Sequence, residues 1–376
     1  MKNIDRLFVY YNDRKVGTMA LHKGHLAAFV YDPGWLSDGF SVSPFSLPLE
    51  NRVFIPKYDP FDGIFGVFSD SLPDGWGRLL IDRLLTRNHM DPHEIGNLTR
   101  LSIVGNTGMG ALSYEPDFPV SKADVHEDYD YIASECRKIL DEKEPDDLDA
   151  LFRLGGSSGG ARPKILTRID GEDWIIKFPA GHDPESIGRQ EYEYSLCAKT
   201  CGIEMPRTQL FASKHCSGYF GVRRFDRENV SGGVKKIHMI SVSGLLETSH
   251  RIPNLDYDIL MRLTLELTKD FSEVEKLYRL MCFNVFAHNR DDHSKNFSYL
   301  YLDDAQHWVL SPAYDLTYSS SLGGEHATMV HGNGRNPGKK DLLAVASGIG
   351  ISRRKASAIA DEIRECTSEM LREYLR

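Results

Sequence analysis

The sequence predicts an α+β protein with two domains, a β-rich one followed by one dominated by long helical patterns. The chain has 376 residues, which is more than one compact domain usually holds. Short apolar runs separated by turn residues fill the first part, whereas long helical periodicities appear later. With 41% hydrophobic and 26% charged residues, the composition is globular and excludes a largely disordered or collagen-like chain.

Charge and cysteine content narrow the class of protein. Lys and Arg number 45 against 54 Asp and Glu, and the net charge of −9 disfavours a protein that wraps nucleic acid with its whole surface. No apolar run approaches the roughly 20 residues that span a bilayer, and charges occupy the N-terminus where a signal peptide is apolar. Six cysteines without CxxC spacing indicate no zinc site and no disulfide scaffold. We therefore expect a cytoplasmic protein that does not contact membranes.

Residues 1–115 are expected to form the β-rich domain. A proline-broken tract over 41–49 predicts an extended edge. A helix is predicted over 77–86, because its leucines recur on one side. Strands are predicted at 6–11, 16–21, 25–31 and 110–114.

Residues 116–150 are rich in Asp and Glu and are predicted to be a linker with one surface helix over 129–140. The second domain is expected over 151–376. Its predicted strands are 151–154, 164–168, 174–178, 297–302 and 307–310, and its predicted helices are 188–200, 257–268, 274–288 and 353–376.

A glycine-rich loop opens the second domain, with four glycines between Gly155 and Gly160. Glycine lets backbone N–H groups surround a phosphate. The Walker A pattern fails here because Ala161 follows Gly160, and a plain mobile loop is the alternative. The predicted order is strand, glycine loop, strand, Asp170-Gly171 turn and strand.

The last of these strands carries Lys177 among apolar residues, so this lysine either extends to solvent at an edge or pairs with an anion. Protein kinases use the same order, with a third-strand lysine on the ATP phosphates. That lysine needs a carboxylate from the next helix. Glu191 and Glu193 are candidates that cannot face the same way, and either could instead be an ordinary surface glutamate.

A polar loop at 288–296 supplies the strongest signal. Asp291 and Asn296 lie five positions apart, as in the kinase catalytic loop, where they provide a proton acceptor and a Mg²⁺ ligand. Asp315 follows the predicted hairpin, where the second Mg²⁺ carboxylate is expected, although the glycine of the kinase DFG motif is missing and Leu316-Thr317 follow instead. The alternatives are a plain polar loop and a hydrolase-type metal site. Hydrolysis would leave the glycine loop and Lys177 without a role, which favours a kinase-like protein.

With these motifs assembled, the chain resembles the HipA family of bacterial serine/threonine kinases, the toxins of HipA–HipB toxin–antitoxin modules. The resemblance runs nearly from end to end and implies a two-lobed kinase-like fold after a β-rich domain, with the smaller lobe ending near residue 224. Its motifs in the first domain are at 16–18, 29–32, 46–49, 70–75 and 108–112. In the second domain they are at 159–164, 177–179, 224–227, 292–296 and 314–316.

The resemblance implies ATP and Mg²⁺ as cofactors and assigns the site residue by residue. Asp291 becomes the catalytic base, and Asn296 and Asp315 become the metal ligands. Alignment of Gly202 with the glycine that ends the family's helix selects Glu191 as the lysine's partner. The full set implied for nucleotide binding is Gly159, Gly160, Ala161, Arg162, Lys164, Lys177, Glu191, Arg223, Arg224, Phe225, His293 and Lys295.

The family also implies regulation by autophosphorylation in the glycine loop, at Ser157 or its neighbour Ser158. A phosphate there adds about −1.5 to −2 charges to a site built for the phosphates of ATP, so it would inhibit. One departure is visible: the segment 235–241, where many relatives carry an acidic residue, has none.

Two classes of function follow from the resemblance. The first is an ATP-dependent kinase toxin that phosphorylates a component of translation, such as an aminoacyl-tRNA synthetase, and inactivates itself. The second is a catalytically weak scaffold that acts as co-repressor with a helix-turn-helix, HipB-like antitoxin. In both, DNA is contacted only indirectly, through the antitoxin. The presence of Lys177, Asp291, Asn296 and Asp315 together favours the kinase.

Overall fold

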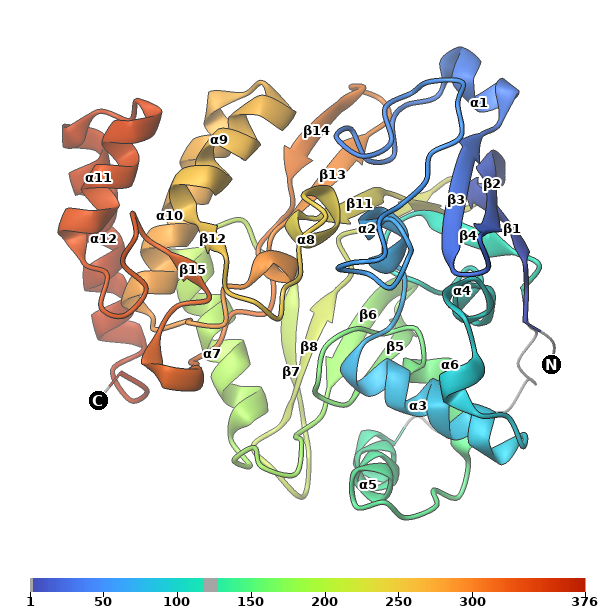
Figure 1. Cartoon of the computed structure of the whole chain (residues 1–376). Helices are drawn as coiled ribbons and strands as arrows, with labels where there is room; N and C mark the ends of the chain where they lie inside the picture. The colour runs from blue at the N-terminus through green and yellow to red at the C-terminus, as the bar shows by residue number, and fades with distance from the viewer. Residues whose placement is uncertain (1–2, 118–127, 376) are drawn as a thin grey trace. The chain divides into compact units, whose positions relative to one another are not determined.

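The computed structural model describes residues 3–117 and 128–375 and separates into two compact units (Figure 1). The first unit comprises 1–188 and 210–248, and the second comprises 189–209 and 249–376. Helix α7 (Ile187–Thr200) and strand β7 (Thr208–Phe211) cross from one unit into the other. The domain boundaries that the sequence predicted, at residues 115 and 150, both lie inside the first unit.

The N-terminal sheet of the first unit confirms the predicted early strands. It has the order β3-β2-β1-β4, and all its neighbours are antiparallel. Gly17 lets two strands approach closely, because a Cβ there would lie 2.4 Å from the carbonyl oxygen of Val30 and 2.6 Å from the Phe29 ring. The strands are β1 (Arg6–Tyr11), β2 (Arg14–His22), β3 (Leu26–Tyr31) and β4 (Leu112–Glu115).

Short helices and loops accompany this sheet. The tract 41–49 makes one isolated bridge, between Ser43 and Leu47, rather than a strand. The predicted helix at 77–86 is present as α3 and begins two residues earlier. The helical segments are α1 (Pro33–Asp38), α2 (Gly66–Ser69), α3 (Gly75–Arg87), η1 (Pro92–Glu94) and α4 (Asn97–Val104).

Helix α5 (Tyr129–Leu140) has the predicted bounds, but it is more than a surface helix. Its apolar face, with Ile132, Cys136 and Ile139, is buried in the same core cluster as Trp76 of α3. The acidic region after the β-rich part therefore contributes to the core of the first unit.

The predicted strand at 151–154 is wrong, because these residues belong to helix α6 (Leu148–Gly155). The Asp147 carboxylate accepts the Ala150 N–H at 2.8 Å and caps the helix, which the apolar run alone does not reveal. Leu151 and Phe152 then lie one turn from Leu148 and are buried in the core. The glycine loop thus follows a helix rather than a strand.

After the loop, the predicted hairpin forms from β5 (Lys164–Ile169) and β6 (Glu172–Lys177). Asp170 and Gly171 both have positive φ, 50° and 79°, as a tight hairpin turn requires. β6 pairs in turn with β8 (Tyr219–Arg223). The rest of the first unit consists of the β9 (Arg227–Val230) and β10 (Gly233–Lys236) hairpin, β11 (His238–Ser241) and α8 (Val242–Leu245).

The second unit is mainly helical. Helix α10 packs against α9 and α12, and α11 packs against α9 and α12. The predicted helices are confirmed as α9 (Tyr257–Thr268), α10 (Phe271–Phe286) and α12 (Arg353–Met370), and α11 (Lys339–Ile349) is additional. Shorter elements are β12 (Leu255–Asp256), η2 (Ser294–Asn296), β13 (Ser298–Leu302), β14 (His307–Leu310), η3 (Leu322–Gly324) and β15 (Thr328–Met329).

The hairpin β13–β14 is confirmed, with Tyr299 opposite Leu310, and β12 pairs with β15 in parallel. None of the helices in the described part of the chain is long and apolar enough to cross a membrane.

Candidate active site

The glycine loop between α6 and β5 is held by the start of α3. The Gly160 N–H donates to the Asp74 carboxylate, and the Trp76 N–H donates to the Gly160 carbonyl at 2.9 Å. A Cβ on Gly75 would lie 2.4 Å from the Gly160 carbonyl oxygen. Lys164 Nζ donates to the Gly159 carbonyl and closes the loop from its other end. These contacts give the loop a defined shape, which a plain mobile loop would lack.

Asp74 is a contact residue that the sequence did not reveal. It stands at the N-cap of α3, where an aspartate ordinarily accepts a hydrogen bond from its own helix, but its side chain makes no such bond. Its carboxylate instead accepts a hydrogen bond from the Gly160 N–H. Backbone N–H groups of this kind bind phosphate in glycine loops. No periodicity links residues 86 positions apart, so only the fold brings them together.

Both predicted phosphorylation sites are turned inward. The Ser157 hydroxyl donates to the Thr107 carbonyl at 3.1 Å, and the Ser158 hydroxyl donates to the Gly155 carbonyl at 2.5 Å. Ser157 and Ser158 are buried. The loop must therefore open before either hydroxyl can accept a phosphoryl group.

Two predicted phosphate ligands face each other beside this loop. Lys164 at the start of β5 is paired in register with Lys177 at the end of β6. Like charges directly opposite each other are unfavourable, and an anion between them relieves the repulsion. Lys177 Nζ also lies 5.5 Å from the ring centroid of Phe220 on β8. Arg162 makes a two-pronged ion pair with Asp183, at 2.9 and 3.0 Å, which fixes the segment that follows the loop.

The predicted adenine hinge begins where β8 ends. Arg223 Nε lies 2.9 Å from Glu172 Oε1, and the Arg224 N–H donates to the Asp173 carbonyl at 2.8 Å. The Arg224 side chain is buried against Asp226, at 2.9 and 2.7 Å, and against the Gly108 carbonyl at 3.0 Å. Only the backbone of Arg224 and the half-buried Phe225 therefore fit the predicted role in adenine binding.

The buried Asp226 carboxylate organises this hinge. Arg227 also pairs with it at 2.9 Å, and the Gly110 N–H donates to it at 2.7 Å. Burial alone would raise the pKa of Asp226, but Arg224 and Arg227 together lower that pKa to about 2. The carboxylate therefore stays charged and ties the β-rich domain, at Gly108 and Gly110, to the hinge.

The end of the segment 235–241, which has no acidic residue of its own, contacts a carboxylate from elsewhere in the first unit. Asp70 accepts hydrogen bonds from the Ser241 N–H and from the Ser241 hydroxyl, both at 2.7 Å. Ser71, the next residue, accepts the Tyr114 hydroxyl at 2.6 Å. The motif at 70–75 thus contacts two parts of the predicted kinase core, through Asp70 and through Asp74.

In the second unit, the polar loop after α10 presents Asp291 to solvent. The Asp291 side chain is 60% exposed, and its carboxylate lies 3.9 Å from His293 Nε2. Asn296 Nδ2 donates to the Asp291 main-chain carbonyl at 2.6 Å, which sets the distance between the predicted base and the predicted metal ligand. The Lys295 N–H donates to His293 Nδ1 at 3.2 Å, so this imidazole supports the loop as well.

The neighbouring Asp292 is an anchor. It is 1% exposed and accepts hydrogen bonds from the Tyr257 hydroxyl at 2.9 Å and the Thr328 N–H at 3.2 Å, with His326 Nδ1 at 3.0 Å. Burial and this carboxylate raise the pKa of Tyr257 well above its usual range. Asp292 therefore holds the loop to α9 and β15, while Asp291 remains accessible.

Asp315 follows a tyrosine that is tied to the same loop. The Tyr314 hydroxyl contacts the Lys295 carbonyl and the Ser298 hydroxyl, each at 2.6 Å. Asp315 has φ 59°, in the left-handed region that few non-glycine residues adopt and that aspartate adopts more readily than most. A carboxylate and an amide oxygen are the hard ligands that Mg²⁺ prefers, so the donor types of Asp315 and Asn296 fit this ion.

The two candidate glutamates on α7 differ as predicted. Glu191 is 2% exposed, whereas Glu193 is at the surface, accepts the Tyr374 hydroxyl at 2.5 Å and pairs with Arg189 at 3.4 Å. The predicted residues therefore form two groups. The glycine loop, Lys164, Lys177 and the hinge belong to the first unit, and Glu191, Asp291, Asn296 and Asp315 belong to the second.

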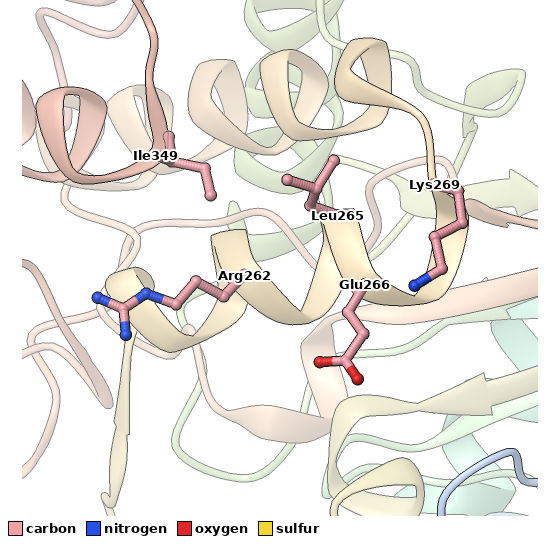
Figure 2. Close-up of a pocket in the computed structure, with 5 residues that line it drawn as sticks. All are labelled: Arg262, Leu265, Glu266, Lys269 and Ile349. Carbon is pink, nitrogen blue, oxygen red and sulfur yellow. The ribbon is translucent and has the colours of Figure 1, made fainter.

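A shallow pocket of about 480 Å³ lies elsewhere, on the helical part of the second unit (Figure 2). Its lining comes from one side of α9 with the following Lys269, and from the end of α11. The lining residues are Arg262, Leu265, Glu266, Lys269 and Ile349. None of these is a predicted nucleotide ligand.

Comparison with known proteins gives two separate family matches, one in each half of the chain. Residues 7–115 match the HipA N-terminal domain, and residues 156–370 match the HipA-like C-terminal domain. A protein of Sinorhizobium fredii named "Putative kinase Y4mE" is 23% identical over 97% of this chain and 91% of its own length. A second one, "Putative kinase Y4dM", is 27% identical over 39% of this chain and only 37% of its own length.

Among solved structures, HipA of Shewanella oneidensis MR-1, in complex with HipB and operator DNA, has the same fold. Its TM-score is 0.72 and its identity 18%, over 98% of this chain and 90% of that one. The overall fold and the two domain matches therefore indicate the same family. The chain that they describe carries the glycine loop, the facing lysines and the Asp291 loop. The chain belongs to the HipA family.

Proposed function

We propose that the protein is an ATP-dependent serine/threonine kinase. The observation that carries the proposal is the division of roles between two adjacent aspartates, because Asp292 anchors the loop and Asp291 is left exposed beside Asn296. This is the arrangement that transfer to a hydroxyl requires, with an acceptor for its proton close to a metal ligand.

In the proposed reaction, Asp291 accepts the proton of a serine or threonine hydroxyl. The hydroxyl oxygen forms the new bond to the γ-phosphorus, and the bond to the β-phosphate oxygen breaks, with ADP as leaving group. Lys164 and Lys177 hold the phosphates, and Glu191 orients Lys177. Mg²⁺, when bound, would neutralise charge on the phosphates, with Asn296 and Asp315 as its ligands.

The test is incubation of the purified protein with ATP and Mg²⁺, followed by mass spectrometry of the peptide that carries Ser157 and Ser158. We expect one added phosphate in the wild type and none in Asp291→Asn. Asp304→Asn changes an exposed carboxylate in the turn of the β13–β14 hairpin and serves as the matched control. Absence of both ATP binding and phosphorylation in the wild type would exclude the kinase. Equal phosphorylation of Asp291→Asn would exclude Asp291 as the base.

We further propose that the kinase is the toxin of a toxin–antitoxin module in the cytoplasm and that it pairs with a HipB-like helix-turn-helix antitoxin. Family membership and the likeness to a HipA solved with HipB and operator DNA support this partner. The proposed substrate is a component of translation such as an aminoacyl-tRNA synthetase. Expression of the wild type without the antitoxin should arrest growth, and co-expression should restore it. If Asp291→Asn arrests growth as strongly as the wild type does, toxicity does not depend on phosphorylation.

The second candidate is a co-repressor scaffold, which the solved HipB and operator complex of the relative favours. It predicts tighter operator binding by the antitoxin in the presence of either the wild type or Asp291→Asn. DNA would then be contacted through the antitoxin. A loss of operator affinity only in the inactive variant would contradict this role.

A further inference from the structure

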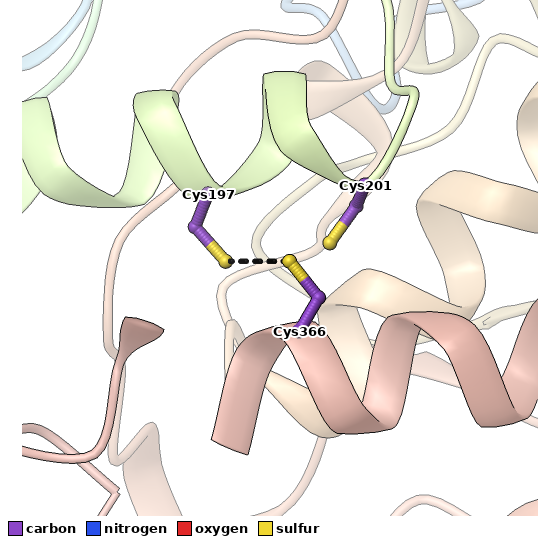
Figure 3. Close-up of side chains that lie close together, drawn as sticks. All are labelled: Cys197, Cys201 and Cys366. Atoms are coloured by element: carbon purple, nitrogen blue, oxygen red, sulfur yellow. Dashed lines mark hydrogen bonds between the residues drawn. The ribbon is translucent and has the colours of Figure 1, made fainter. Parts of the chain in front are cut away.

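Three cysteines that are distant in sequence converge between two helices of the second unit (Figure 3). Cys197 lies on α7, Cys201 closes the last turn of that helix, and Cys366 lies on α12. Their Sγ atoms all lie within 4.8 Å of one another, and those of Cys197 and Cys366 are 4.0 Å apart. Three sulfurs around one ion at about 2.3 Å would be about 4 Å apart, so little movement separates this cluster from a coordination site.

A fourth soft donor lies beside the three thiols. The Met370 Sδ is 3.7 Å from the Cys366 Sγ, one helical turn further along α12. Thiolate and thioether sulfurs select Cu⁺ and related soft ions over Mg²⁺ or Ca²⁺. Zn²⁺ sites usually complete a tetrahedron of cysteine, histidine or carboxylate ligands. The only group of three or more His, Cys, Asp and Glu ligands found among the described residues consists of these three cysteines.

One arginine bridges the two helices that carry the thiols. Arg279 on α10 donates to the Cys201 carbonyl at 2.7 Å and pairs with Glu362 on α12 at 3.0 and 3.1 Å. Glu362 lies one turn before Cys366, so a single guanidinium joins the backbone of one thiol-bearing helix to the other.

Cys366 gives an ion access to the cluster, whereas the raised thiol pKa values oppose its binding at neutral pH. Cys197 and Cys201 are buried, whereas Cys366 is partly exposed and opens the cluster to solvent. Burial raises the pKa of Cys366 to about 11, and the Cys197 thiol together with burial raises the pKa of Cys201. The Cys201 and Cys366 thiols are therefore protonated at neutral pH, and each thiol that ligates an ion must release its proton.

We propose that Cys197, Cys201 and Cys366, with Met370 at the edge, form a site for one Cu⁺ ion. The absence of CxxC spacing predicted no zinc site and no disulfide scaffold, and no sequence pattern pointed to this cluster. The i, i+4 spacing of Cys197 and Cys201 puts both thiols on one face of α7, and the fold supplies the third thiol from a segment 165 residues away. The site does not depend on kinase activity.

The test is titration of the reduced full-length protein with Cu⁺ under anaerobic conditions, in competition with a chromophoric Cu⁺ chelator. We expect one ion per chain, accompanied by proton release. Cys366→Ser should lower the Cu⁺ affinity at least about tenfold, since loss of a direct ligand costs no less than loss of a group that supports one. Because Cys366 is partly exposed, this variant should fold. Cys197→Ala provides a second variant, and circular dichroism of each checks folding.

Cys216→Ser is the matched control, because Cys216 is equally half-buried but lies in the first unit. It should bind as the wild type does. Failure of the wild type to take up Cu⁺, or equal affinity in Cys366→Ser, would overturn the proposal. So would uptake of Zn²⁺ without uptake of Cu⁺, or oxidation of the cluster to a disulfide as the only effect of adding copper.

Discussion

The adjacent residues Asp291 and Asp292 have the same side chain and opposite environments. Asp292 satisfies the buried Tyr257 hydroxyl and meets His326, whereas the Asp291 side chain is mostly in solvent. Removing one partner from a buried network leaves the others unsatisfied, whereas groups that contact an exposed carboxylate can turn to water when it is removed. We therefore expect substitution of Asp292 to lower the stability of the protein and substitution of Asp291 to lower its activity.

We expect Asp292→Ala to lower the free energy of unfolding by about 2 to 4 kcal/mol, because buried polar groups lose their acceptor. Asp291→Ala should change it by less than about 0.5 kcal/mol and abolish phosphoryl transfer. Urea denaturation followed by circular dichroism measures the first quantity, and the phosphorylation assay measures the second. Similar stability of the two variants would show that the Asp292 network does not hold the loop.

Asp74 gives a second prediction at this scale. Asp74→Ala removes a charged acceptor from the Gly160 N–H, a hydrogen bond worth about 1.5 to 3 kcal/mol. Amide hydrogen exchange in the loop should accelerate about 10- to 100-fold, and Ser157 should become more accessible. Asp91→Ala removes an exposed cap from η1 and is the control. Unchanged exchange in the loop of Asp74→Ala would mean that the carboxylate does not restrain it.

At the scale of elements, α6 determines where the glycine loop begins. A four-residue apolar run such as 151–154 is too short to distinguish strand from helix, and the helix signal lies upstream in the Asp147 cap. The hairpin β5–β6 was predictable because its Asp170-Gly171 turn is specific to two-residue connections. Local signals therefore located the hairpin but not the helix before it.

Asp147→Ala should destabilise the first unit by about 0.5 to 2 kcal/mol through loss of the α6 cap. Thermal unfolding followed by circular dichroism measures the change. Asp147→Ser retains a capping oxygen and should recover most of it. If Ala and Ser behave alike, the cap does not contribute.

At the scale of the whole molecule, the order of most elements could be read from the sequence, and the candidate site residues could be named because their patterns are local. The spacing of Asp291, Asn296 and Asp315 is local, and so is the pattern around Lys177. Contacts between distant segments, such as Asp74 with Gly160 and Asp70 with Ser241, follow no sequence period and needed the fold. The three-cysteine cluster was missed for the same reason, since Cys366 comes from the far end of the chain.

A pH dependence of the molecule's stability follows from Asp226. Its folded pKa of about 2 lies below the ordinary value of 3.8, so below pH 4 the unfolded chain binds the proton more readily. The contribution of the ionised Asp226 carboxylate to the free energy of unfolding is therefore fully present above about pH 4 and is lost as the pH falls towards 2. The full contribution is about 2 kcal/mol. Urea unfolding at pH 5, 4 and 3 should show a shallower acid dependence for Asp226→Asn than for the wild type. Equal slopes would contradict this assignment.

The segment from Asp70 to Gly77 limits which hybrid genes can encode a folded protein. It belongs to the N-terminal domain, but its side chains and glycines shape the loop and the Ser241 segment that follow much later in the chain. A hybrid gene that joins the C-terminal half of this protein to the N-terminal half of a distant relative would have to preserve these few positions. Recombination between such genes should therefore succeed only when residues 70–77 and the glycine loop come from the same parent.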